Sequence, residues 1–365
     1  MNTRNLGRND VQTQSAPRGH RAGRIGVLSL LLSQGILAQE VSYEVLHKFN
    51  PFPLGTELSS TLVQGADGSL YGTTRAGGAN NLGTIVKLDP DGILTTVLHS
   101  FDGTDGANPE AGLTPGPGGS FYGTTTVGGT IFRLDPDGVL TTLHAGIARI
   151  GEASLTLGHD GCLYGTTHGS PWCSPCPGTV FKLDTGGNLT TIHTFEDDGS
   201  GPPFEGYGPT ASLAQGPSEN LYGTTPDGGA NDLGTIFMLD PNGALTTFHS
   251  FQGSDGIAPV AALTPGSDGH LYGTTLLGGA NGFGTIFELD GDGALQTLHS
   301  FEGSDGAWAL GGLTVGLDGS LYGTTSRGGA NDLGTIFNFD ANGVLTTSTL
   351  LMEPMGRPIP KEVSY

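Results

Sequence analysis

The chain has 365 residues, which is enough for a large core or several domains, and only 13% of them are charged. Fourteen basic residues stand against 35 acidic ones, a formal net charge of −21. This balance excludes partners that need positive charge, such as nucleic acids and anionic lipids. Glycine accounts for 65 residues without a Gly-X-Y period, which excludes collagen and indicates turns at fixed positions.

The first 38 residues differ in composition from the rest. Residues 1–24 hold five arginines and a single acid, and an apolar run that starts at Ile25 precedes the small residue Ala38. This order is typical of a secretory signal peptide, so we predict cleavage near Ala38 and no transmembrane segment in the mature chain. An uncleaved membrane anchor is the alternative. Residues 39–365 then carry 9 basic and 34 acidic residues, which suits an exported soluble protein.

The remaining chain is built from a repeat. The string Leu-Tyr-Gly-Thr-Thr, with Phe in place of Leu once, occurs six times. Its tyrosines are Tyr71, Tyr122, Tyr164, Tyr222, Tyr272 and Tyr322. A period of about 50 residues predicts a repeat architecture, in which a residue found in every copy serves the structure of the repeat.

Each copy contains four short apolar runs separated by Gly, Pro, Asp or Asn. In the fifth copy these runs are 261–264, 267–275, 284–290 and 294–301. Such runs predict short strands joined by tight turns, and four strands in a unit of this length predict the blade of a β-propeller. The runs lack clean alternation, as expected for strands covered on both faces by neighbouring blades. A parallel β-helix is the competing architecture, but its coils are usually shorter.

We predict an all-β protein, a β-propeller of six four-stranded blades within residues 39–351. The units lie near 60–101, 111–145, 153–195, 211–251, 261–301 and 311–350. A stray copy of the last strand at 41–49 is predicted to close the ring by pairing into the final blade. A seventh blade, built from residues 41–60 and the tail, is the alternative. Val97 is one residue more than other copies have, which predicts a β-bulge, and the third unit carries insertions at 168–177 and 196–209.

Three motifs recur together: Asp-Gly-x-Leu-Tyr-Gly-Thr-Thr, Gly-Gly-Ala-Asn-x-x-Gly-Thr-Ile-Phe-x-Leu-Asp and Leu-Thr-Thr-Leu-His-Ser-Phe-x-Gly-x-Asp-Gly. Their combination resembles the GloVer tandem repeat, a family of secreted bacterial proteins that end in varying cell-surface anchors. The resemblance covers about 60 to 350 and implies an exported, propeller-like protein with no established enzymatic activity. The tail at 352–365 departs from the family, because it holds neither an apolar anchor helix nor a sorting signal, and this favours release.

A histidine occupies the same place in the last strand of most copies. These residues are His47, His99, His144, His193, His249 and His299. A catalytic histidine is needed only once, so we interpret them as structural, each hydrogen-bonded to a turn or to a neighbouring threonine. The repeated tyrosines and Thr-Thr pairs are interpreted in the same way, as blade packing and cross-strand pairs.

Acidic residues recur in the Gly-rich loops at 101–106, 251–256 and 301–306. Calcium prefers carboxylate and carbonyl oxygens of this kind. The weak calcium candidates are Asp102, Asp105, Asp255, Glu302 and Asp305. The spacing does not match an EF-hand, and Asp before Gly is ordinary turn chemistry, so plain turns are the main interpretation. No other cofactor is indicated.

Two of the three cysteines lie in the string Trp-Cys-Ser-Pro-Cys at 172–176. This string is similar to a thioredoxin active site, but it lies in a loop between two strands and not at a helix N-terminus, which argues against redox catalysis. We predict a Cys173–Cys176 disulfide that holds the loop, and a buried free thiol at Cys162. A zinc site formed by the three cysteines and His168 is the alternative.

Residues that break the repeat are the candidates for a ligand site. The loop after each Tyr-Gly-Thr-Thr begins differently in every copy, and these loops are expected to share one mouth of the ring. The ligand-face candidates are Arg75, His168, Trp172, Asp227, Trp308 and Arg327. Solvent exposure alone also explains variation of this kind.

The sequence contains no recognisable nucleophile–base pair, zinc signature or phosphate loop. The leading hypothesis is therefore a secreted or cell-surface repeat protein without enzymatic activity, which binds an extracellular protein or glycan through one propeller face. A hydrolase or lyase with a site in the central channel is the second hypothesis, by analogy with other propellers alone. A structural component of a surface layer is the third.

Overall fold

The computed structural model describes residues 56–58, 61–90, 94–150, 153–168, 178–195, 204–216 and 219–349. The regular elements in these ranges are β-strands, apart from one 3₁₀ turn, η1 (Pro117–Gly119). Within this part of the chain, no helix is long and apolar enough to cross a membrane. The predicted signal peptide at 1–38, the closing strand at 41–49 and the tail at 352–365 lie outside the described residues.

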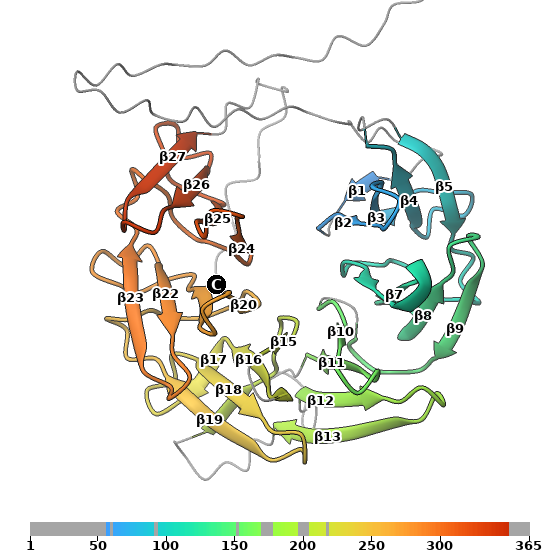
Figure 1. Cartoon of the computed structure of the whole chain (residues 1–365), viewed down its shortest axis with the longest axis horizontal. Helices are drawn as coiled ribbons and strands as arrows, with labels where there is room; N and C mark the ends of the chain where they lie inside the picture. Colours follow the sequence, from blue (N-terminus) through green and yellow to red (C-terminus); the bar gives the residue numbers. More distant parts are fainter. Residues whose placement is uncertain are drawn as a thin grey trace, which may run out of the picture. The chain divides into compact units, whose positions relative to one another are not determined.

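Apart from one two-stranded ribbon, the described strands form six antiparallel sheets, one for each repeat, and these sheets are arranged in a ring (Figure 1). Blade one consists of β2 (Val63–Gln64), β3 (Leu70–Ala76), β4 (Thr84–Leu88) and β5 (Leu94–Ser100), and blade two of β6 (Thr114–Pro115), β7 (Phe121–Thr125), β8 (Thr130–Leu134) and β9 (Leu140–His144). Blade three consists of β10 (Thr156–Leu157), β11 (Leu163–Thr167), β12 (Gly178–Leu183) and β13 (Leu189–Phe195), and blade four of β15 (Ala214–Gln215), β16 (Leu221–Thr225), β18 (Thr235–Leu239) and β19 (Leu245–Ser250). Blade five consists of β20 (Thr264–Pro265), β21 (Leu271–Thr274), β22 (Thr285–Leu289) and β23 (Leu295–Ser300), and blade six of β24 (Thr314–Val315), β25 (Leu321–Thr325), β26 (Thr335–Phe339) and β27 (Leu345–Thr349). The predicted six-bladed β-propeller is confirmed.

Three strands are additional to the four of each blade. β1 (Thr56–Leu58) pairs with β3, so the described part of the segment considered for a seventh blade belongs to blade one. β14 (Phe204–Tyr207) pairs with β17 (Asp227–Gly229) and forms a small ribbon beside blade four. The insertion expected at 196–209 therefore contributes a strand.

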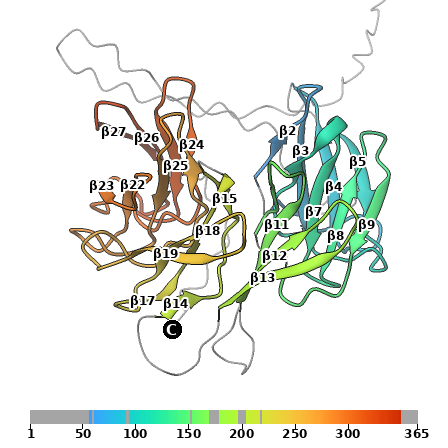
Figure 2. The ribbon, with the colours of Figure 1, turned by 60° about the horizontal axis from the view of Figure 1, so that its bottom comes forward.

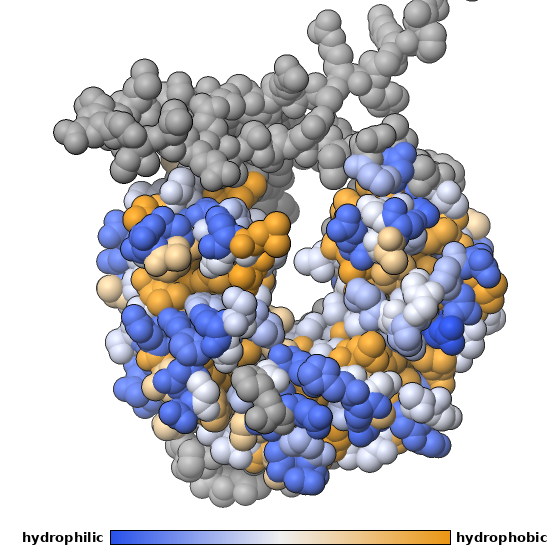
Figure 3. All heavy atoms as spheres, viewed as in Figure 1, coloured by the Kyte–Doolittle hydropathy of each residue, from blue (hydrophilic) through white to orange (hydrophobic). Residues whose placement is uncertain are grey.

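The core lies between neighbouring blades, where the third strand of each blade is covered on both of its faces. Ile85 and Phe101 of blade one share a cluster with Phe121 and Phe132 of blade two, and the Phe101 and Phe132 rings lie 5.5 Å apart. The pairs Phe195–Phe237, Phe251–Phe287 and Phe301–Phe337 repeat this contact at 5.2, 5.6 and 5.4 Å. Strands with both faces covered explain the apolar runs without alternation. Figure 3 shows hydrophilic residues over much of the outer rim, with apolar residues between them.

The glycine of Leu-Tyr-Gly-Thr-Thr is required by this packing. A Cβ atom on Gly223 would lie 2.3 Å from Cζ of Phe237 on the adjacent strand, which is far inside van der Waals contact. The corresponding glycines meet the same phenylalanine atom at 2.4 Å; they are Gly123, Gly165, Gly273 and Gly323. Only glycine lets the phenylalanine ring lie against the backbone here.

The two threonines of the motif have different roles. The second pairs across strands within its blade, as in Thr225 with Thr235, whose hydroxyl oxygens are 2.8 Å apart. The first donates a hydrogen bond to the next blade, as in Thr224 to the main-chain oxygen of Ala261 at 3.2 Å. Blades one, three and five repeat this bond in the pairs Thr73–Ala111, Thr166–Ala211 and Thr274–Gly311. The cross-strand pair matches the prediction, whereas the bond between blades is an addition to it.

Antiparallel strands sort the connections onto two faces of the ring. We call the loop face the one that carries the connections between second and third strands and those from blade to blade. The turn face carries the turns between first and second strands and between third and fourth strands. β14 and β17 lie on the loop face (Figure 2).

A β-bulge positions the repeated histidine. In blade five the register shifts between Ile286, which faces His299, and Phe287, which faces Thr297. Blades one to four have the same shift, whereas blade six, which lacks the histidine, pairs without one. Blade one has a second irregularity between Lys87 and Leu88. This second irregularity is the bulge predicted for the extra residue of blade one, although Val97 itself is paired with Val86.

Candidate functional site

The repeated histidines bind the aspartate of the Gly-rich loop that follows. The distance from His Nε2 to Asp Oδ2 is 2.5 Å for His99–Asp105, 2.9 Å for His249–Asp255 and 2.8 Å for His299–Asp305. Each of these imidazoles also packs edge-on against the phenylalanine two residues later, with ring centroids 5.0 to 5.3 Å apart. The same contacts in three blades indicate that the histidine supports the loop.

The five calcium candidates lie in these same loops. The second carboxylate oxygen of Asp105, Asp255 and Asp305 accepts a main-chain N–H three residues earlier, at 2.8 to 3.1 Å. Both oxygens are therefore engaged within the loop. Asp102 accepts hydrogen bonds from the main chain and hydroxyl of Thr104, and Glu302 contributes its main-chain N–H to Asp305. The arrangement accounts for the four aspartates as turn-forming residues.

Trp172, Cys173 and Cys176 lie outside the described residues, so the disulfide and the zinc alternative stay predictions. Cys162 is a free, buried thiol. Burial, followed by the nearby carboxylate of Asp160, raises the pKa of this thiol. A protonated, buried cysteine is chemically inert, which fits a packing role.

All ligand-face candidates within the described residues belong to the loop face. Arg75 follows the Thr-Thr pair of blade one, and its Nε lies 2.6 Å from Glu110 in the connection to blade two. Both side chains are partly exposed, so this ion pair contributes little to stability. The other candidates form two groups, one around Trp308 and one around His168.

Trp308 has an unusual backbone conformation for its residue type. Its φ is +58°, in the left-handed region, where a bulky residue is uncommon. The equivalent positions hold Asn108, Arg149 and Ala258, at φ of 56°, 58° and 53°. Main-chain hydrogen bonds to Phe283 and from Ser326 fix the conformation, at 3.2 and 3.0 Å. The loop face thus places a tryptophan at a position that takes asparagine, arginine and alanine in other copies.

The Trp308 side chain is stacked with an arginine of the next blade. The guanidinium carbon of Arg327 lies 4.8 Å from the centre of the Trp308 ring, and its Nη1 is 3.5 Å from Asp332. Trp308 is 38% exposed, Leu310 beside it 55%, and Phe283, which accepts its N–H, 39%. We call Phe283, Trp308, Leu310 and Arg327 the Trp308 patch. An exposed aromatic with a planar cation is suited to binding, not to the core.

His168 and Asp227 form the second group, at corresponding loops of blades three and four. The Nδ1 atom of His168 is buried and lacks a hydrogen-bond partner among the described residues. Desolvation, with a further contribution from Asp232, raises the pKa of Asp227, while nearby His168 opposes the shift. The Asp227 side chain is nevertheless exposed in part. His168 therefore lies close enough to Asp227 to lower the pKa of its carboxyl in part.

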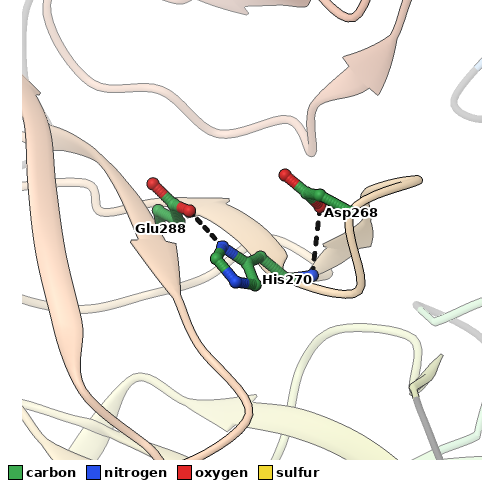
Figure 4. A group of neighbouring side chains, drawn as sticks. All are labelled: Asp268, His270 and Glu288. Carbon is green, nitrogen blue, oxygen red and sulfur yellow. Dashed lines mark hydrogen bonds and ion pairs between the residues drawn. The ribbon is translucent and has the colours of Figure 1, made fainter.

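The turn face holds a cluster that sequence reasoning missed. Lys87 lies 2.6 Å from Asp67 in blade one, and Lys182 lies 2.7 Å from Asp160 in blade three. In blade five the lysine position is Glu288, next to His270 and Asp268 (Figure 4). The fourth residue of Thr-Ile-Phe-x-Leu varies from copy to copy, and an alignment of the copies at this place would have found the cluster.

The ring of six repeated four-stranded blades defines a β-propeller repeat protein. Residues 35–211 and 177–356 match the model of the Gloeobacter/Verrucomicrobia repeat. These matches cover most of the sequence, and the chain belongs to this family. The resemblance seen in the three recurring motifs is confirmed.

Several solved structures are similar to the chain. A streptogramin B lyase is 19% identical with a TM-score of 0.57, covering 82% of this chain and 84% of that chain. A catalytically inactive virginiamycin B lyase from Staphylococcus aureus, with quinupristin, is 16% identical with a TM-score of 0.58, covering 80% and 84%. A protein assigned as a 6-phosphogluconolactonase from Bacteroides fragilis is 17% identical with a TM-score of 0.54, covering 85% and 86%. At these identities the similarity shows the fold alone. A comparison with curated protein sequences gave no match.

Proposed function

We propose that the chain is a secreted or cell-surface repeat protein without enzymatic activity, which binds an extracellular protein or glycan through its loop face. The stack of Trp308 and Arg327 carries this proposal. Tryptophan and arginine are the residue types that dominate the energetics of binding surfaces. Phe283 and Leu310 add exposed apolar area on either side of the stack.

The backbone of Trp308 supports the same conclusion. A non-glycine residue in the left-handed region costs about 1 kcal/mol or more. Asn108 and Ala258 show that smaller residues serve this position in other blades. The tryptophan leaves 38% of its surface exposed there, whereas the aromatic residues of the core are buried. Its presence is better explained by a partner outside the chain.

The charge and the N-terminal sequence indicate where that partner lies. The excess of acidic residues disfavours nucleic acids and anionic membranes as ligands. The basic and apolar segment that ends at Ala38 favours export. The ligand is then a component of the cell surface or of the surrounding medium.

The test is a screen of residues 39–365 against arrayed glycans and extracellular proteins. The Trp308→Ala variant copies Ala258 of the preceding repeat and should fold normally. We expect a component that binds the wild-type chain and is lost by this variant, while Leu317→Ala on the turn face binds as wild type does. Absence of any binder, or equal binding by Trp308→Ala, would contradict the proposal.

A lyase or hydrolase is the second candidate, and His168 with Asp227 favours it. Neither residue is part of the repeat, and a neighbouring imidazole and carboxyl are the groups that acid–base catalysis needs. The test is turnover of a panel of lactones and cyclic esters. Activity that His168→Ala abolishes would support catalysis, and no turnover above that of this variant would reject it.

A further inference from the structure

We propose that blade five carries a divalent metal site formed by Asp268, His270 and Glu288. Asp268 and His270 belong to the turn that precedes β21, and Glu288 lies on β22, where it faces Tyr272 across the strand pair. One ligand atom from each of the three side chains lies within 4.8 Å of the other two (Figure 4). The hairpin thus brings an imidazole and two carboxylates to one place on the turn face.

Two other blades show that this place can take a cation. In blade one the ammonium of Lys87 lies 2.6 Å from Asp67 and 5.4 Å from the centre of the Tyr71 ring. In blade three Lys182 repeats the contact with Asp160 at 2.7 Å and with the ring of Tyr164 at 5.4 Å. The carboxylate and the tyrosine are therefore a frame for a positive charge in two copies of the repeat.

Blade five retains the carboxylate and the tyrosine but has no lysine at this place. Asp268 and Tyr272 are present and hydrogen-bonded at 2.6 Å, but the lysine position is Glu288. The residue two places after the aspartate, Ser69 in blade one and Cys162 in blade three, is here His270. Two substitutions at once have replaced an internal ammonium by a second carboxylate and an imidazole, and both new groups are metal ligands.

The ligands indicate the class of metal. His270 Nδ1 is in contact with the Glu288 carboxylate. Asp268 Oδ1 accepts a hydrogen bond from the main-chain N–H of His270 at 3.1 Å, which holds the turn in place. One nitrogen and two carboxylate oxygens suit zinc and similar first-row divalent ions, whereas calcium prefers oxygen ligands alone.

The site is open on one side. Asp268, Tyr272 and Glu288 line a groove of about 500 Å³ between blades five and six, which Leu298 and Asp340 also border. Three protein ligands leave a tetrahedral ion with one position for water or another small ligand. The groove gives that ligand access from the solvent.

The test uses the full chain freed of metal with a chelator, with zinc alone as the probe. The double variant His270→Ser, Glu288→Lys rebuilds the Asp–Ser–Lys pattern of blade one and is the matched control. We expect titration calorimetry to show a site with one zinc ion per chain in the wild type, weakened at least about tenfold in the double variant. We also expect zinc to raise the melting temperature of the wild type only.

The same comparison distinguishes the site in blade five from zinc binding elsewhere in the chain. Cys162, Cys173, Cys176 and His168 are intact in the double variant, so binding there survives. Equal stoichiometry and affinity in both proteins, or no zinc binding by the wild type, would overturn the proposal. If the double variant does not fold, His270→Ser alone is measured, and unchanged zinc affinity in that protein overturns it.

Discussion

The hydroxyl of Thr224 donates a hydrogen bond to the main-chain oxygen of Ala261, at 3.2 Å, and so joins blade four to blade five. Thr124 occupies the same place in blade two, but its buried hydroxyl has no partner among the described residues. The contact between blades therefore combines apolar packing with a buried hydrogen bond that most, but not all, described copies make.

Replacing Thr224 with Val should destabilise the protein by about 1 to 3 kcal/mol, because the buried oxygen of Ala261 loses its donor. The matched control is Thr124→Val, which removes a hydroxyl that is already unsatisfied and should be neutral or stabilising. Chemical denaturation of both variants measures the difference. Equal effects would show that the bond between blades contributes nothing.

Replacing Gly223 with Ala should destabilise the fold by about 1 to 3 kcal/mol through overpacking. The new methyl group would lie 2.3 Å from the ring of Phe237, which is fully buried and has no room to move. Gly291 lies in a turn where an added Cβ meets nothing within 4 Å, so Gly291→Ala should leave the melting temperature unchanged. A tolerant Gly223 would contradict the packing account of the motif.

The architecture could be predicted because the same pattern of strands and turns occurs six times in the sequence. Each copy supplies the same four strands and the same turns, so errors in one copy are corrected by the others. Packing across blades also follows, since a run such as Thr-Ile-Phe must be covered on both sides. The bulge that positions His299 and the bond from Thr224 to Ala261 were not predictable, because both depend on register and on a contact between separate copies.

The candidate sites were less accessible to sequence reasoning. Trp308 and Arg327 could be chosen because they break the repeat, but no local pattern indicates the positive φ of Trp308 or its contact with Arg327. In the sequence, His270 appears only as a variant at a position where other copies hold serine. Its interpretation as a metal ligand depends on Glu288, which lies 18 residues away in the chain and across the hairpin.

Replacing Asp227 with Asn should stabilise the protein at neutral pH. Desolvation raises the pKa of Asp227 above its ordinary 3.8, so the folded state favours the neutral carboxyl. That contribution is complete below pH 3.8 and is lost as pH rises through the raised pKa. The amide should therefore raise the melting temperature at about pH 7 and have no effect near pH 3, with a gain below about 1 kcal/mol because the side chain is partly exposed. Asp137→Asn in an exposed turn is the control, and a gain that grows toward acid pH would contradict this sign.

Calcium should not stabilise the Gly-rich loops. The carboxylates of Asp105, Asp255 and Asp305 already accept hydrogen bonds from histidine and from the main chain. Adding calcium to the metal-free His270→Ser variant should leave its melting temperature unchanged. A rise that disappears in Asp255→Asn would show that a loop does bind the ion.

The affinity of the Trp308→Ala variant for the ligand found in the screen tests the binding function most directly. If the Trp308 patch is the centre of the contact, the dissociation constant should rise about 30-fold or more, which corresponds to the loss of about 2 kcal/mol at a central aromatic residue. The melting temperature should not fall, because Ala258 shows that alanine fits this backbone. An unchanged dissociation constant for Trp308→Ala, equal to that of Leu317→Ala, would show that the loop face around Trp308 is not where the partner binds.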